Sequence, residues 1–134
     1  MIEQLRYYLA GQAASIPTYV LEQSLVTLFG WMPTVVGIGL RALVYRLIMQ
    51  FDGAPAIEAG VRLAHAGNVR LGKNVYLDRG VYLHALPGGI SIGDNTFLMH
   101  HTVLHVFNFR QLPHAGITIG KNCFFGEYNV VRGQ

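Results

Sequence analysis

Residues 92–105 read IGDNTFLMHHTVLH, and aliphatic side chains recur at every sixth position, at Ile92, Leu98 and Leu104. The same spacing occurs in one triplet before this stretch and one after it: Leu71, Leu77 and Leu83, and Ile119, Phe125 and Val131. A fixed short period repeated along a chain is typical of a fold built from stacked equivalent units. We therefore expect these nine side chains to point into one shared core.

Each triplet opens with a similar sequence, LGKN, IGDN or IGKN, which places Asn74, Asn95 and Asn122 at equivalent positions. Glycine and asparagine tolerate the left-handed backbone that a tight corner requires. Three six-residue units with a corner after each predict a triangular coil. The triplets begin at Leu71, Ile92 and Ile119, so both intervals are longer than three such units. The extra residues, near 86–89 and between 106 and 116, are expected to form loops outside the coil.

The repeated motif, aliphatic-Gly-x-Asn-small-x, resembles that of the hexapeptide-repeat acyltransferases over residues 57–134. The resemblance implies a mainly β fold, a left-handed parallel β-helix of hexapeptide repeats preceded by an α-helical N-terminal segment. It also implies direct transfer of an acetyl or other acyl group from acetyl-CoA to a hydroxyl of a saccharide. In this family a histidine is the general base, no metal is needed, and the active sites of a homotrimer lie between subunits.

Residues 1–52 differ from the repeats, because their apolar side chains follow helical spacing, and a turn-rich stretch separates them from residues 53–134. Residues 23–40 carry no charge, but Pro33 and three glycines interrupt them. We expect a helix, a break at residues 30–33, and a second amphipathic helix with Arg41 and Arg46 on its polar face. Such a segment binds a membrane surface peripherally or caps the β-helix, and an amphipathic face alone leaves both open.

The stretch LFGWMPTVVGIGLRALVYRLIM, before the repeats, resembles membrane-associated sugar O-acetyltransferases of surface polysaccharide biosynthesis. This implies a saccharide or lipid-linked saccharide acceptor. The ten Lys and Arg residues are scattered rather than clustered, which does not indicate a nucleic-acid partner. One cysteine and an N-terminus unlike a signal peptide favour a cytoplasmic protein, at the inner face of the membrane if the helices bind lipid.

Histidine supplies the candidate catalytic groups, because its pKa lies near neutral pH. His101 is expected at a corner and His105 on the outside of a strand, where the longer insertion begins. That insertion carries three candidate acceptor-binding residues: Asn108, Arg110 and His114. His65 is similar to a histidine that the family has before its first full coil. No cysteine pair accompanies the histidines, so the spacing does not predict a zinc site.

The chain stops at Gln134, in the middle of a coil, whereas the resemblance implies further coils and a catalytic histidine soon after a stretch like Arg132-Gly133-Gln134. We therefore expect an incomplete β-helix, in which the base is either His101 or His105 or a histidine beyond Gln134. Two alternatives remain open at this point. One is a non-catalytic β-helix that serves as a scaffold or oligomerisation module. The other is a metal-binding hexapeptide-repeat protein of the carbonic-anhydrase-like type.

Overall fold

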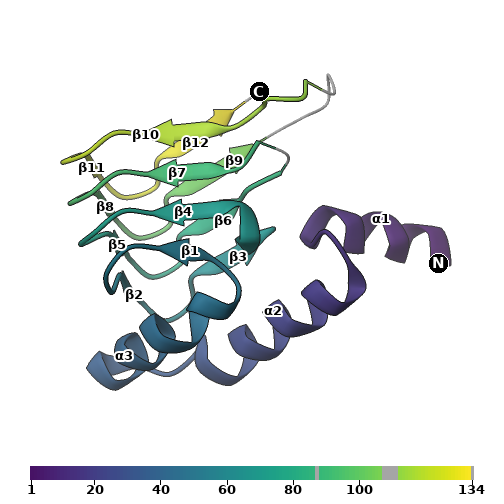
Figure 1. The fold of residues 1–134 in the computed structure, drawn as a ribbon, viewed down its shortest axis with the longest axis horizontal. Coiled ribbons are helices and arrows are strands. Elements are labelled where there is room, and N and C mark those ends of the chain that lie inside the picture. Colours follow the sequence, from purple (N-terminus) through teal and green to yellow (C-terminus); the bar gives the residue numbers. More distant parts are fainter. Residues whose placement is uncertain (87, 107–111, 134) are drawn as a thin grey trace.

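The computed structural model describes residues 1–86, 88–106 and 112–133. Within them, short strands form three parallel sheets of four strands each. The strand orders are β1-β4-β7-β10, β2-β5-β8-β11 and β3-β6-β9-β12, so each turn of the chain adds one strand to every sheet. Figure 1 shows the resulting stack of coils. The architecture is a parallel β-helix, as the six-residue spacing predicts.

The strands are two to four residues long, as six-residue units with corners require. The first coil holds β1 (Gln50–Phe51), β2 (Ala56–Ile57) and β3 (Arg62–Ala64); the second holds β4 (Val69–Leu71), β5 (Tyr76–Leu77) and β6 (Tyr82–His84); the third holds β7 (Ile90–Ile92), β8 (Phe97–Leu98) and β9 (Val103–Val106); and the fourth holds β10 (Ile117–Ile119), β11 (Phe124–Phe125) and β12 (Val130–Gly133). Because Phe51 pairs with Leu71, the first coil begins before the turn-rich stretch at residues 52–55.

The core consists of stacked aliphatic and aromatic side chains, one ladder for each sheet. Leu71, Ile92 and Ile119 are direct register partners, which confirms the predicted stacking. Of the nine side chains predicted to point inward, seven are buried. Phe125 and Val131 in the last coil are only half-buried against this core. Full burial of one such side chain contributes about 1.5–3 kcal/mol, so the repeats supply most of the stabilising apolar area.

The predicted corners adopt the left-handed backbone. Asn74, Asn95 and Asn122 have φ values of 55°, 58° and 57°. The Asn74 side-chain amide donates to the Asn95 side-chain oxygen over 3.1 Å, which links consecutive coils along this corner. The sequence LGKN, IGDN or IGKN therefore marks the same corner of every coil in which it occurs.

The N-terminal segment contains α1 (Ile2–Gln12), α2 (Ile16–Phe29) and α3 (Thr34–Val44), followed by the 3₁₀ turn η1 (Tyr45–Leu47). The Ser15 hydroxyl caps α2 by accepting from the Thr18 backbone N–H, and Pro17 occupies its first turn. The predicted break at residues 30–33 separates α2 from α3. Figure 1 shows α2 and α3 beneath the first coil, at the end of the β-helix opposite the C-terminus.

One sequence-based expectation for α3 is wrong. Arg41, predicted on the polar face, is fully buried, whereas Leu43 and Leu47 are 68% and 67% exposed. The helix ends at Val44 and tightens into η1, which turns Leu47 outward and Ile48 inward. Among the described residues, no helix is both long and apolar enough to cross a bilayer.

Candidate functional site

Histidine side chains line the outer face of the sheet formed by β3, β6, β9 and β12. Ala64, His84, His105 and Arg132 are successive register partners across this sheet. Side chains alternate along a strand, and the residues before His84 and His105 are buried leucines, so both histidines point outward. His65 directly follows Ala64 and ends this edge of the first coil with a left-handed backbone, φ 55°. We call His65, His84 and His105 the histidine ladder.

The last turn of α1 fixes two rungs of the histidine ladder. His65 Nε2 lies 2.9 Å from the Ala10 carbonyl oxygen, and His84 Nε2 lies 2.9 Å from the Gly11 carbonyl oxygen. A helix leaves its last carbonyls without intrahelical partners, so both are available as acceptors. A carbonyl can only accept, so we assign the ring proton of each histidine to Nε2. The Nδ1 atom of His84 is then an acceptor, and it is buried without a hydrogen-bond partner among the described residues.

The upper two rungs form the closest ring pair of the ladder. The His84 and His105 ring centroids are 4.3 Å apart and the rings are inclined by 32°, whereas the His65 and His84 centroids are 6.0 Å apart. Burial lowers the pKa of His105 below its usual value, and the neighbouring His84 and Arg132 lower it further. Burial likewise lowers the pKa of His65. His105 is therefore a neutral imidazole at neutral pH, the form that accepts a proton.

A second group of polar side chains lines a shallow corner pocket of about 390 Å³. Its lining residues are Glu58, Asp78, Arg79, His100, His101 and Tyr128. His101 has φ 60°, as its predicted corner position requires, and its ring stacks on Tyr128 with centroids 5.1 Å apart. His100 Nδ1 lies 3.9 Å from an Asp78 carboxylate oxygen. His101 is therefore positioned by stacking on Tyr128, and His100 by its pairing with Asp78.

The structure separates the two candidate catalytic histidines. His101 belongs to the corner pocket, while His105, further along the chain on β9, belongs to the histidine ladder. The His101 ring contacts His100 and Tyr128, whereas the His105 ring contacts Tyr82 and His84, so the two imidazoles belong to separate groups. His114 is exposed on the insertion after β9. Asn108 and Arg110, the other candidate acceptor-binding residues, lie outside the described residues.

Sequence reasoning missed the partnership of His84 with His105. Both directly follow an inward leucine, and these leucines, Leu83 and Leu104, occupy equivalent places in consecutive coils. The equivalent positions of these two leucines were therefore the sequence signal from which the pairing of the two histidines could have been predicted. Across residues 1–86, 88–106 and 112–133, no three histidine, cysteine, aspartate or glutamate side chains come together in a way that could hold a metal ion.

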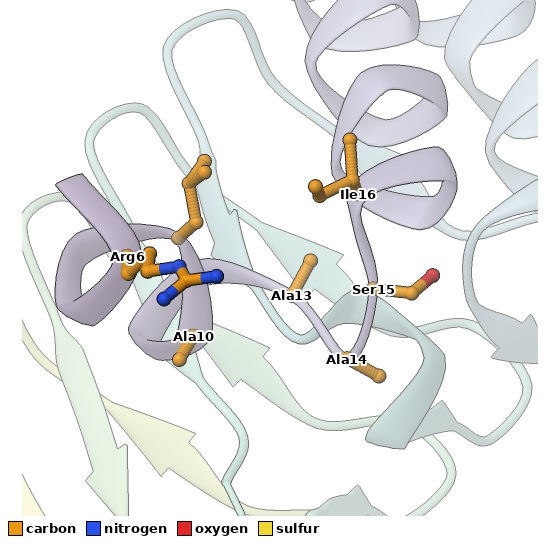
Figure 2. Close-up of a pocket in the computed structure, with 7 residues that line it drawn as sticks. Arg6, Ala10, Ala13, Ala14, Ser15 and Ile16 are labelled. Atoms are coloured by element: carbon orange, nitrogen blue, oxygen red, sulfur yellow. The ribbon is translucent and has the colours of Figure 1, made fainter. Parts of the chain in front are cut away.

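A separate hollow, of about 200 Å³, lies between the end of α1 and the start of α2 (Figure 2). Small apolar side chains form most of it, and Arg6 contributes its single charged group. The Ser15 hydroxyl points away from Arg6 in this view and is bound to Thr18. This hollow offers no proton-transfer group among the described residues. We therefore take the histidine ladder as the candidate functional site.

The chain matches no protein-family model, and neither the curated proteins nor the solved structures contain a significant match to it.

Proposed function

We propose that the protein is an acyltransferase that moves an acetyl group from acetyl-CoA to a hydroxyl of a saccharide, with His105 as the general base. The observation that carries this proposal is the histidine ladder. His105 is partly buried, faces outward, and its ring lies 4.3 Å from that of a histidine that α1 holds in place. The insertion that begins after β9, with Asn108, Arg110 and His114, is the part proposed to hold the acceptor.

The proposed reaction needs one proton carrier and no acyl-enzyme. Neutral His105 takes the proton of the acceptor hydroxyl while the hydroxyl oxygen attacks the thioester carbonyl. The tetrahedral intermediate then collapses, the carbon–sulfur bond breaks, and the proton passes from His105 to the departing CoA sulfur. Arg132, the next register partner after His105, supplies a positive charge near the developing oxyanion. No redox partner or metal enters this balance.

The finer features of the fold and assembly belong to the same proposal. The coil is proposed to be left-handed, as in the hexapeptide-repeat acyltransferases, and the protein to act as a cytoplasmic homotrimer. The outer face of one sheet supports self-association. The β4-β7-β10 sheet presents Arg70, Ser91 and Thr118, whereas the β5-β8-β11 sheet presents Tyr76, Phe97 and Phe124. A continuous aromatic strip of this kind is typical of a surface that another subunit covers.

The test is CoA release from acetyl-CoA across a panel of saccharide acceptors. We expect turnover by the wild-type protein and a loss of about 100-fold or more in kcat/KM for His105→Gln, the usual range for removing a general base. His101→Gln is the matched variant, because it removes the other candidate imidazole from the corner pocket. A large loss with His101→Gln and none with His105→Gln would place the base at the corner instead. No turnover with any acceptor would favour the non-catalytic scaffold.

A further inference from the structure

The helix α1 is attached to the β-helix at its C-terminal end. All of α1 lies within the described residues, none of its side chains is buried, and Figure 1 shows its N-terminal part extending outward from the coils. His65 donates to this end twice, through Nε2 to the Ala10 carbonyl over 2.9 Å and through its backbone N–H to the Gln12 carbonyl over 2.7 Å. His84 donates through Nε2 to the Gly11 carbonyl over 2.9 Å. Three consecutive carbonyls of α1 are therefore held by the histidine ladder.

Two side chains on β6 border the His105 ring. The His84 ring lies against it, with the two centroids 4.3 Å apart and the planes inclined by 32°. The Tyr82 ring is nearly perpendicular to it, at 84°, with the centroids 6.2 Å apart. An imidazole packed between two other rings cannot turn about its side-chain torsions unless one of them moves. The plane of the His105 ring therefore depends on where His84 and Tyr82 are held.

Other ionisable groups face these rings from both neighbouring strands and from α1. Arg62 on β3 lies over the Tyr82 ring, with its guanidinium carbon 5.4 Å from the ring centroid, and Arg132 on β12 is the register partner of His105. Burial raises the pKa of Tyr82, Arg62 opposes this rise, and Tyr8 on α1 adds to it. Tyr8 is therefore close to Tyr82, so α1 reaches this group of rings at a second point.

From these contacts we infer that α1 positions the His105 imidazole through His84. While the last turn of α1 is helical, the Gly11 carbonyl holds the Nε2–H of His84, and the buried Nδ1 atom of the same ring remains an acceptor. His84 then keeps one tautomer and one orientation, with its face against His105. When the last turn unwinds, His84 loses the acceptor that holds it, and the His105 ring loses its packed neighbour.

The same contacts attach the helix and orient the ring, so the docking of α1 and the orientation of His105 are coupled in both directions. A helix without buried side chains has little apolar contact to keep it in place, and such elements open at a low cost in free energy. The docked state of α1 is the one in which His105 is oriented to take a proton. That functional consequence rests on the proposed acyl transfer, whereas the coupling of α1 to the two histidines does not.

The test compares two substitutions of Gly11 in the full chain. Gly11→Pro disrupts the last turn of α1, because proline lacks a backbone N–H and its ring clashes with the preceding turn. Gly11→Ala is the matched control, since its Cβ would enter open space and alanine favours a helix. Both variants keep the carbonyl group and every side chain of the histidine ladder. The hydrophobic core of the described chain contains no residue of α1, so both variants retain the β-helix.

Two measurements report on the coupling without any activity. Trypsin cleavage after Arg6, an exposed residue of α1, should be about tenfold or more faster in Gly11→Pro than in Gly11→Ala, because cleavage requires an opened helix. Long-range proton–nitrogen correlation spectra should show His84 protonated at Nε2 in the wild-type protein and in Gly11→Ala, and a mixture of tautomers in Gly11→Pro. Burial lowers the pKa of His105 and the neighbouring His84 lowers it further, so the His105 titration should move to higher pH in Gly11→Pro.

His84→Phe examines the coupling from the other side, because it keeps a ring beside His105 and removes the donor to Gly11. Cleavage after Arg6 should be faster in this variant too. In the CoA-release assay, kcat/KM should be about tenfold or more lower for Gly11→Pro than for Gly11→Ala, since a displaced base loses its alignment with the acceptor.

Unchanged His84 and His105 resonances in a Gly11→Pro protein whose α1 is cleaved rapidly would overturn the inference, because the rings would then keep their places without the helix. Equal cleavage of His84→Phe and the wild-type protein would overturn it as well. The expected changes in cleavage and resonances, in a protein that transfers no acetyl group, would support the coupling and overturn only the proposed acyl transfer.

Discussion

His105 and Arg132 are the residues whose coupling tests the proposed chemistry most directly. Burial, His84 and Arg132 all lower the pKa of His105, so its basic form persists to a lower pH than that of an ordinary histidine. The expected kcat/KM profile rises with pH, and the midpoint of the rise lies below about 6.5, the usual histidine pKa. Arg132→Gln removes one of the lowering charges, so the rise should move to higher pH. If Arg132→Gln leaves the pH profile of kcat/KM unchanged, the general base does not belong to the histidine ladder.

Glu22 is a buried carboxyl whose environment makes folding depend on pH. Burial raises its pKa to about 7, and the backbone N–H groups of Ala66 and Gly67 oppose this only in part. Both oxygens lack a hydrogen bond of good geometry to the described residues. Since the folded pKa exceeds the unfolded value of 4.5, the folded state binds more protons between these two values, and stability falls as pH rises through this range.

Replacing Glu22 by glutamine keeps the shape and removes the charge. Glu22→Gln should change stability little at pH 5 and raise the free energy of unfolding by roughly 1–3 kcal/mol at pH 8 relative to the wild-type protein. Urea denaturation of both proteins at the two pH values measures this difference. Equal effects at pH 5 and pH 8 would mean that the carboxyl is not protonated in the folded protein.

Gly80 shows how one corner position constrains the side chain above it. The φ angle of Gly80 is 75°. A Cβ atom at this position would overlap Nδ1 of His101, which lies at the same corner of the following coil. Gly80→Ala should therefore lower the free energy of unfolding by more than about 1 kcal/mol. Gly39 is the matched control, because it lies on α3 and, apart from its chain neighbours and the nearby backbone of its own helix, nothing lies within 4 Å of the place that its Cβ would take. Gly39→Ala should be neutral or stabilising in the same denaturation experiment, since alanine favours a helix.

The α2–α3 element depends on Arg41 to hold its break against the first coil. Arg41 donates to carbonyls at the break and on β2, and it is fully buried. Arg41→Met should cost about 2–3 kcal/mol of stability, because hydrogen bonds of a charged donor are lost and the carbonyls stay buried. Arg46→Met is the control: Arg46 is exposed, and its change should stay within about 0.5 kcal/mol. Chemical denaturation of the two variants measures the difference, and equal losses would mean that the break does not need its buried donor.

For the molecule as a whole, the proposed trimer predicts a species three times the 14.8 kDa chain mass in light scattering. The aromatic strip of Tyr76, Phe97 and Phe124 on the β5-β8-β11 sheet is the expected contact. Phe97→Glu should dissociate the assembly, because a charge at a buried contact remains unpaired. Ser91→Glu, on the polar outer face of β7, should leave it intact. A monodisperse wild-type monomer would contradict the trimer.

The β-helix could be predicted from the sequence because its determinants are local and repeated. The six-residue spacing placed Leu71, Ile92 and Ile119 in one ladder, and the corner asparagines matched the left-handed backbone that each corner needs. Each coil repeats the same steric problem, so residue order and period suffice to solve it. The helix break at residues 30–33 was equally local, since proline and glycine act on their own backbone.

Only the tertiary structure decided which outward side chains meet. His84 and His105 stand on different coils, and they become neighbours because β6 and β9 pair in a register that places one directly beside the other. Arg41 points inward because the break leaves carbonyls that need a donor, although its position in the sequence pattern suggested a solvent-facing charge. Spacing along a chain sets the direction of a side chain within its own element. The partner that lies in that direction depends on how the elements pack, and that follows from the balance of burial and hydrogen bonding over the whole fold.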